Sequence, residues 1–192
     1  VKKITDWAKE NNYLEKIEIL TFLDNNISLN WLDKSGAKVQ NLLTKGSLNH
    51  LKYQIKKKPK EYFNLVKECI ENALKLGISS NVYLEDWSNG MRNSKQYVID
   101  YLDILSELPV ERVLLPDTLG ILSPKETFEY ISFVVKKYPN IHFDFHAHND
   151  YDLSVSNVIE SLKAGCHGLH LTINGMGERA GNAPMASVAA VI

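Results

Sequence analysis

The stretch Ile141-His-Phe-Asp-Phe-His-Ala-His-Asn-Asp150 joins a short apolar run to a cluster of polar side chains. Residues 141–145 have the length and composition of a buried strand, and the polar cluster begins directly after it. Side chains alternate along an extended chain, so His146 and His148 are expected to point to the same side. Two imidazoles on one side of a strand end can chelate a divalent metal ion. Spacing alone leaves open that they are ordinary polar residues.

The same strand pattern recurs along the chain. Five further apolar runs are predicted as strands, at residues 16–23, 39–44, 81–85, 112–115 and 168–173. Amphipathic segments with apolar residues at three- and four-residue steps are predicted as helices, at residues 61–76, 94–108, 125–138 and 152–164. Gly77 and Gly165 are expected to end two of these helices, and Ser123 with Pro124 to begin a third. Strands that alternate with helices predict a parallel sheet with helices outside it.

Two α/β architectures have this order of elements, an open doubly wound sheet and an eightfold barrel. A doubly wound nucleotide-binding fold would show a glycine-rich turn after an early strand, and none is present. Polar side chains follow every predicted strand instead, at residues 24–26, 45–47, 85–86, 117–118, 146–150 and 174. A barrel gathers the carboxyl ends of all its strands around one site. The sequence therefore predicts a TIM (β/α)8 barrel, truncated to about six βα units.

The composition is that of a soluble globular domain and excludes several classes of partner. Apolar residues make up 44% and charged residues 23% of the 192 residues, and the formal net charge is -1. Such a charge provides no field to hold nucleic acid or an anionic membrane. No apolar run approaches the ~20 residues needed to span a bilayer. Cys69 and Cys166 are far apart in apolar surroundings, so we expect two core residues and a reducing cytoplasm.

A second motif, Asn174-Gly-Met-Gly-Glu-Arg-Ala-Gly-Asn182-Ala-Pro, directly follows the last predicted strand. Its three glycines allow sharp turns and a close approach of the backbone to a ligand. Glu178 and Arg179 can pair, and Asn182 can offer a carbonyl oxygen to a metal. The alternative is a tight turn before a helix. Around the first motif, Asn149-Asp150 is expected to orient the two histidines.

Two more segments place chemically active side chains at strand ends. Thr118 lies just past a predicted strand, where its hydroxyl can bind a carboxylate or merely cap a turn. Tyr83 and Glu85 alternate onto one side of another strand, which in a barrel can be the interior. A carboxylate there, beside a metal, can transfer protons, with a structural salt bridge as the alternative. The remaining histidines are expected to have ordinary roles: His50, His142, His167 and His170.

The first two motifs together resemble the signature of the 2-isopropylmalate, homocitrate and citramalate synthases, which are barrel metalloenzymes with an Asp-Arg-Glu motif, similar to HMG-CoA lyase. The segments that begin at Leu84, Leu115 and His148 are most similar to citramalate synthases of the spirochaete type. The resemblance implies an acyltransferase that condenses acetyl-CoA with a 2-keto acid, with pyruvate giving (R)-citramalate. The alternatives are 2-isopropylmalate or homocitrate synthase, a metal-dependent aldolase or lyase on the same barrel, and an inactive fragment.

The resemblance also implies roles for individual residues. A divalent metal (Zn, Mg or Mn) would be bound by His146, His148 and Asn182. Thr118 would bind the carboxylate of the keto acid, and Glu85 would be the catalytic acid/base. The methyl group of pyruvate would enter a small apolar pocket formed by Leu20, Leu43 and Tyr83. Acetyl-CoA is the implied co-substrate, and the parent enzyme is expected to be a homodimer.

Two parts of the family pattern have no match in this sequence. The family's first strand, with its Arg, its metal-binding Asp and its Glu, is not found, and neither is the C-terminal subdomain. The chain opens within a helical pattern without Met and ends within an apolar one. Residues 1–192 are therefore expected to be a single partial catalytic barrel domain, inactive on its own.

Overall fold

A single parallel sheet runs through the protein. The structure is a computed structural model that describes residues 1–192. The strands are β1 (Glu18–Phe22), β2 (Val39–Lys45), β3 (Ser79–Glu85), β4 (Val110–Asp117), β5 (Phe143–Ala147) and β6 (Gly168–His170). Their order in the sheet equals their order in the chain, and every neighbouring pair is parallel. A doubly wound sheet reverses its strand order at a switch point, so this order is that of a barrel.

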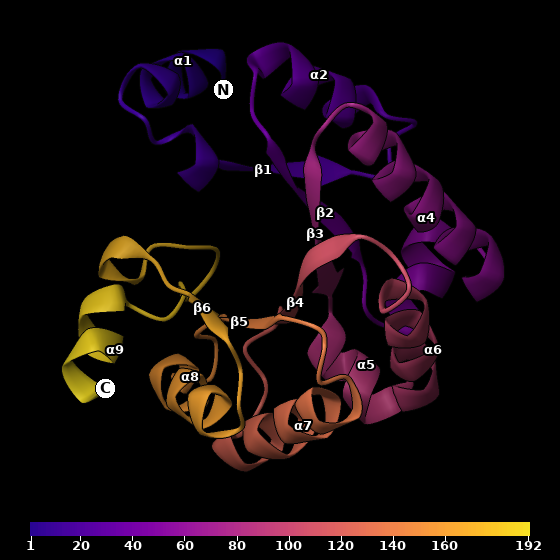
Figure 1. The fold of residues 1–192 in the computed structure, drawn as a ribbon. Coiled ribbons are helices and arrows are strands. Elements are labelled where there is room, and N and C mark those ends of the chain that lie inside the picture. The colour runs from indigo at the N-terminus through magenta and orange to yellow at the C-terminus, as the bar shows by residue number, and fades with distance from the viewer.

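Helices connect the strands and lie outside them (Figure 1). The helices are α1 (Lys2–Glu10), α2 (Ile27–Ser35), α3 (Leu48–His50), α4 (Pro59–Lys75), α5 (Trp87–Asn93), α6 (Lys95–Leu105), α7 (Pro124–Lys137), α8 (Ser154–Lys163) and α9 (Met185–Val191), with short turns η1 (Leu14–Lys16), η2 (Leu51–Ile55) and η3 (Ile173–Gly175). In Figure 1 the six units curve around a common centre, with α1 and α9 at the two ends. The predicted fold class, about six units of a TIM-type barrel, is confirmed.

Strand alternation separates the apolar layer from the barrel interior. On β5, Phe143 and Phe145 are fully buried in the main core between sheet and helices. Asp144 and His146 therefore point to the opposite side, into the interior. The main core contains 30 buried residues, including Cys69 and Cys166, and both cysteines are free, as expected of core residues.

Several element boundaries differ from the prediction. The predicted helix at residues 94–108 is α6, and it is preceded by α5, which was not predicted. The α5 sequence contains glycine, serine and asparagine, which are poor helix formers. Tertiary packing stabilises this helix, because Trp87 and Met91 are buried. The packing also requires glycine at position 90, where a Cβ would lie 2.1 Å from the carbonyl oxygen of Gly46. The predicted strand at residues 168–173 ends at His170, and Thr172 instead bridges to Pro184.

The predicted start of α7 is confirmed in detail. Ser123 accepts a hydrogen bond from the Glu126 N–H, and Glu126 in turn accepts one from the Ser123 N–H, a complete capping box with Pro124 at the first turn. Replacing such an N-cap by alanine usually costs about 0.5–2 kcal/mol. We expect Ser123→Ala to lower the free energy of unfolding by about 1 kcal/mol in urea titrations. Ser187→Ala, at an exposed position inside α9, is the control. An equal loss of stability in the two variants would contradict the cap assignment.

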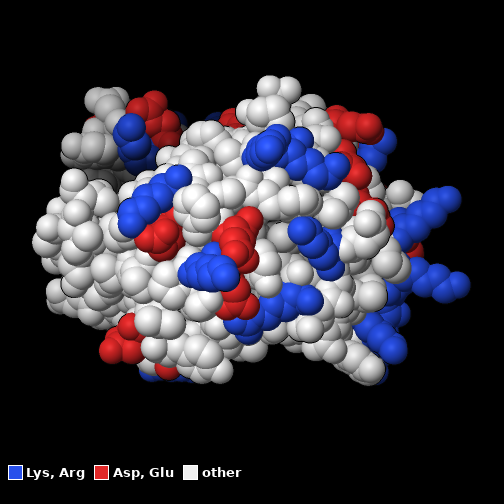
Figure 2. Space-filling model, turned by 90° about the horizontal axis from the view of Figure 1, so that it is seen from below, with Lys and Arg blue, Asp and Glu red and all other residues white.

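The surface carries both signs of charge. Lys and Arg side chains are interspersed with Asp and Glu on the face shown in Figure 2, in keeping with the net charge of -1. None of the helices combines the length and the apolar character that crossing a membrane would require.

Candidate active site

One open cavity of about 360 Å³ lies at the carboxyl ends of the strands. Its size is within the usual range for a small-molecule site. Every site residue predicted from the sequence lines it: Leu20, Leu43, Tyr83, Glu85, Thr118, His146, His148 and Asn182. Pro116, Gly177 and Glu178 complete the lining. The parallel sheet brings these residues together because successive strand ends meet at one edge.

The two histidines of the first motif face each other. His146 is the penultimate residue of β5, on the interior side, and His148 directly follows the last residue of that strand. The Nε2 atoms of the two rings are 3.3 Å apart. Two nitrogen ligands of a tetrahedral ion, each at about 2.0–2.1 Å, lie roughly 3.3–3.4 Å from one another. The spacing of the imidazoles is therefore that of two ligands of one metal ion.

The glycine-rich loop carries Asn182 to the histidines. Asn182 forms an antiparallel bridge with His148, and the Asn149 N–H donates to the carbonyl of Gly181. Gly177 must lack a side chain here, since a Cβ would lie 2.8 Å from the amide carbon of Asn182. The loop thus packs around the Asn182 amide, which is 8% exposed.

The polar atoms around this point fit a metal. The Oδ1 atom of Asn182 is buried without a hydrogen-bond partner, an expensive arrangement unless a ligand satisfies it. Burial, together with the neighbouring imidazoles of His148 and His170, lowers the pKa of His146 to about 3. Burial and the positive charge of Arg179 lower the pKa of His148. Both rings are therefore neutral at pH 7, the form that binds metals.

This chain supplies two imidazoles and one amide oxygen as candidate ligands. No group of three or more His, Cys, Asp or Glu side chains that could hold a metal is formed in it. The candidate set is thus His146, His148 and Asn182, which leaves room at the ion for substrate oxygens or further ligands.

The expectation that Asn149 and Asp150 orient the histidines is wrong. The Nδ1 atoms of His146 and His148 have no hydrogen-bond partner. Asn149 instead accepts from the Ser154 N–H at the start of α8. Asp150 receives two hydrogen bonds, of 2.7 and 2.9 Å, from the guanidinium of Arg179. Its role is to hold the glycine-rich loop.

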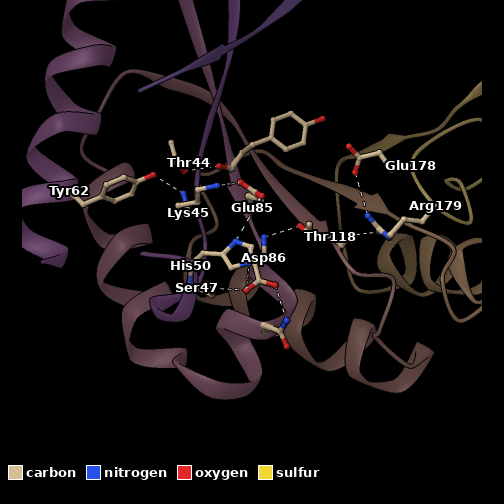
Figure 3. Close-up of polar contacts among 12 residues, drawn as sticks. Thr44, Lys45, Ser47, His50, Tyr62, Glu85, Asp86, Thr118, Glu178 and Arg179 are labelled. Atoms are coloured by element: carbon tan, nitrogen blue, oxygen red, sulfur yellow. Dashed lines mark hydrogen bonds and ion pairs between the residues drawn. The ribbon is translucent and has the colours of Figure 1, made fainter. Parts of the chain in front are cut away.

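Arg179 fastens that loop to two others. Besides Asp150 it donates to the carbonyl of Thr118 at 2.7 Å, and its contact with Glu178 is longer, at 3.4 Å. Thr118 lies in the loop before α7, and Asp150 lies in the loop before α8. The Arg179 side chain therefore joins the glycine-rich loop to both of these strand-end loops. The predicted Glu178–Arg179 pair exists, and Figure 3 shows it beside Thr118.

The hydroxyl of Thr118 is oriented by the backbone. Its Oγ1 accepts a hydrogen bond of 2.8 Å from the Asp86 N–H. Asp86 has a left-handed backbone, with φ of 66°, and its carboxylate is held by Ser47 and Asn89. With one lone pair of Thr118 occupied, its hydrogen is free to be donated into the cavity.

Lys45 lies beside the cavity, and its contact with Glu85 was not predicted from the sequence. The Lys45 side chain is only 14% exposed, and its ammonium group forms an ion pair with Glu85 (Figure 3). Two buried tyrosines fix its backbone, because Tyr62 accepts from the Lys45 N–H and Tyr97 donates to the Lys45 carbonyl. The available signal was its position, directly at a predicted strand end and in register with Glu85 on the next strand.

His50 also approaches this group, although only an ordinary role was expected for it. Its ring nitrogens lie 3.9 Å from a Glu85 oxygen and 3.6 Å from an Asp86 oxygen. Figure 3 shows the ring between the two carboxylates. Glu85 is thus flanked by Lys45 on one side and by His50 on the other.

Residues 19–192 match the family model described as HMGL-like. A homocitrate synthase from Sulfurisphaera tokodaii is 36% identical over 143 residues, 74% of this chain and 30% of that protein. A homocitrate synthase from Saccharolobus solfataricus is 33% identical over the same shares of the two chains. The chain thus spans about 30% of the length of the curated relatives it matches.

Two solved structures share the fold. The HMG-CoA lyase of Bacillus subtilis superimposes with a TM-score of 0.79 at 18% identity, over 91% of this chain and 61% of that one. The hydroxymethylglutaryl-CoA lyase of Pseudomonas aeruginosa gives a TM-score of 0.78 at 19% identity, over 90% and 60%. At these identities the likeness concerns the fold alone.

Proposed function

The chain belongs to the HMGL-like family, and from that premise we propose that the full-length protein condenses acetyl-CoA with a 2-keto acid. The balanced reaction joins the acetyl methyl carbon to the keto carbon, consumes one water and releases free CoA. The relatives named homocitrate synthase support this reaction class. The main support is that one cavity combines the two facing imidazoles of His146 and His148, the carboxylate of Glu85 and the oriented hydroxyl of Thr118.

Each polar side chain of the cavity has a separate role in this reaction. The hydroxyl of Thr118 donates to the carboxylate of the keto acid and orients it. Glu85 accepts a proton from the acetyl methyl group, with Lys45 holding the carboxylate in place. His146, His148 and Asn182 would hold a divalent metal, which when bound supplies Lewis-acid polarisation of the keto oxygen. The enolate of acetyl-CoA then attacks the keto carbon, and hydrolysis of the thioester completes the reaction.

We propose pyruvate as the 2-keto acid and (R)-citramalate as the product. The cavity wall beside the candidate metal ligands is formed by Leu20, Leu43 and Tyr83. This apolar wall suits the methyl group of pyruvate. No Lys or Arg lines the cavity, while Glu85 and Glu178 do. A dicarboxylic acceptor of the homocitrate type would bring a second carboxylate to a lining that offers it no cation, so the relatives' names do not decide the acceptor.

Substrate choice tests this assignment. Overfilling a packed pocket costs about 1–3 kcal/mol, or roughly ten- to a hundred-fold in specificity. Leu20 is 48% exposed, so this cost is expected at the partly buried Leu43 and Tyr83. We expect the full-length protein to release CoA with a higher kcat/KM for pyruvate than for 2-ketoisovalerate or 2-ketoglutarate. Leu43→Ala should narrow the gap between pyruvate and 2-ketoisovalerate by enlarging the pocket.

The control is Leu74→Ala, at an exposed position of α4, which should leave the ratio unchanged. A wild-type preference for 2-ketoglutarate would make the protein a homocitrate synthase, and a preference for 2-ketoisovalerate a 2-isopropylmalate synthase. Either result would overturn the pyruvate assignment and leave the reaction class standing.

A further inference from the structure

A layer of polar side chains lies in the barrel interior and reaches all six strands. Asn81 donates to Asn41 at 2.9 Å and to Glu18 at 3.3 Å. Arg112 pairs with Glu18 and, at 3.2 Å, with Asp144. Asp144 in turn lies 3.1 Å from the Nε2 atom of His170. The layer is formed by Glu18, Asn41, Asn81, Arg112, Asp144 and His170.

One side chain of the cavity wall is bonded to this layer. The phenol oxygen of Tyr83 lies 2.5 Å from the Nδ1 atom of His170. The Nε2 atom of the same ring faces Asp144, so the two ring nitrogens of His170 contact a phenol on one side and a carboxylate on the other. The Tyr83 hydroxyl is therefore the last group of a hydrogen-bonded chain that runs through His170 to Asp144.

The anchor of that chain is firmly held. Asp144 is 2% exposed, and besides Arg112 and His170 it has His142 2.9 Å away. Gly168 makes room for its carboxylate, because a Cβ there would lie 2.1 Å from Oδ1. A residue larger than glycine on the neighbouring strand would displace the anchor.

His170 does not line the cavity, so it can act on a substrate only through its neighbours. Its ring centroid lies 5.6 Å from that of Tyr83 and 5.8 Å from that of His146. Resting on the proposed function, we infer that His170 is a positioning residue, which fixes the Tyr83 ring and thereby makes the pocket selective for a small 2-keto acid.

The bond between Tyr83 and His170 explains the selectivity. The Tyr83 hydroxyl is engaged by His170, so the ring presents carbon rather than a free hydroxyl to the acceptor substrate. Moving the ring aside for a branched substituent would break the bond to His170 and leave two partly buried polar groups unpaired. A rigid aromatic wall results where a free tyrosine would adapt.

The test compares variants of the full-length protein. His170→Phe keeps a ring beside His146 but removes both hydrogen bonds. We expect the kcat/KM ratio of pyruvate over 2-ketoisovalerate to fall about tenfold, with unchanged metal content. His170→Gln, whose amide oxygen and NH2 group can replace the two ring nitrogens, should retain most of the ratio. The losses from Tyr83→Phe and His170→Phe should not add in the double variant, since both break one bond.

An unchanged ratio in His170→Phe, or additive losses in the double variant, would overturn the inference. A crystal structure of His170→Phe separates this from a failure of the proposed function. If the wild-type protein showed no preference for pyruvate, the proposed substrate would be wrong, and the position of the Tyr83 ring would still decide. A displaced or disordered ring supports the anchor, and a ring in its wild-type position overturns it.

Discussion

Replacing His148 by alanine is expected to remove bound metal and nearly all turnover from the full-length protein. The substitution leaves His146 as the only imidazole at a point where two ring nitrogens now lie 3.3 Å apart. A single imidazole and an amide oxygen bind a divalent ion weakly, because affinity depends on the number and geometry of the ligands. Loss of Lewis-acid polarisation removes several kcal/mol of transition-state stabilisation, so kcat/KM should fall roughly a thousand-fold or more.

Metal content measured by mass spectrometry is the readout besides activity. The matched control is His167→Asn, an exposed histidine whose ring accepts from the Phe143 N–H, a bond that an asparagine oxygen can replace. It should retain both metal and turnover. A His148→Ala protein with wild-type metal content and rate would show that the two imidazoles are not ligands.

A parallel sheet, a truncated barrel and the family were predicted from the sequence, and all three are confirmed. Each rests on patterns with a strong physical cause. Apolar runs of strand length and intervening amphipathic segments leave few arrangements. Because a parallel barrel brings its strand ends together, residues scattered from Leu20 to Asn182 could be assigned to one cavity.

Contacts between side chains were less accessible to prediction. Asp150 was expected to orient the histidines but pairs with Arg179 instead. The two residues are 29 positions apart in the sequence, and only the folded loops bring them together. Lys45 was read as part of a polar loop start, although its register opposite Glu85 was implicit in the predicted strands. Such pairs depend on side-chain rotamers and on turns with left-handed residues, as at Asp86, for which no periodicity exists.

The interior polar layer illustrates the same limit. Asp144 and His170 lie on predicted strands, and a polar residue on a strand usually signals the solvent side. In a barrel the alternate face is the interior, where such residues must find partners. His170 was assigned an ordinary role because it lacks the polar surroundings of His146 and His148, although it bonds to Tyr83. Its function could be recognised only once the pairing of six strands was known.

Glu85→Gln is expected to lower kcat by about 10²–10⁴-fold while the KM for pyruvate changes little. The amide has nearly the shape of the carboxylate but cannot accept the proton of the acetyl methyl group. Thr118 and the candidate metal ligands are untouched, so the acceptor still binds. The ion pair with Lys45 is lost, so the folded state is checked by comparing unfolding curves.

Glu111→Gln, an exposed carboxylate on β4, is the matched control and should keep the wild-type kcat. Metal content should be normal in both variants, which separates this effect from that of His148→Ala. If Glu85→Gln raised KM at constant kcat, Glu85 would be a binding residue. If it left both constants within about twofold of wild type, the ion pair with Lys45 would be structural and the base would have to be sought elsewhere.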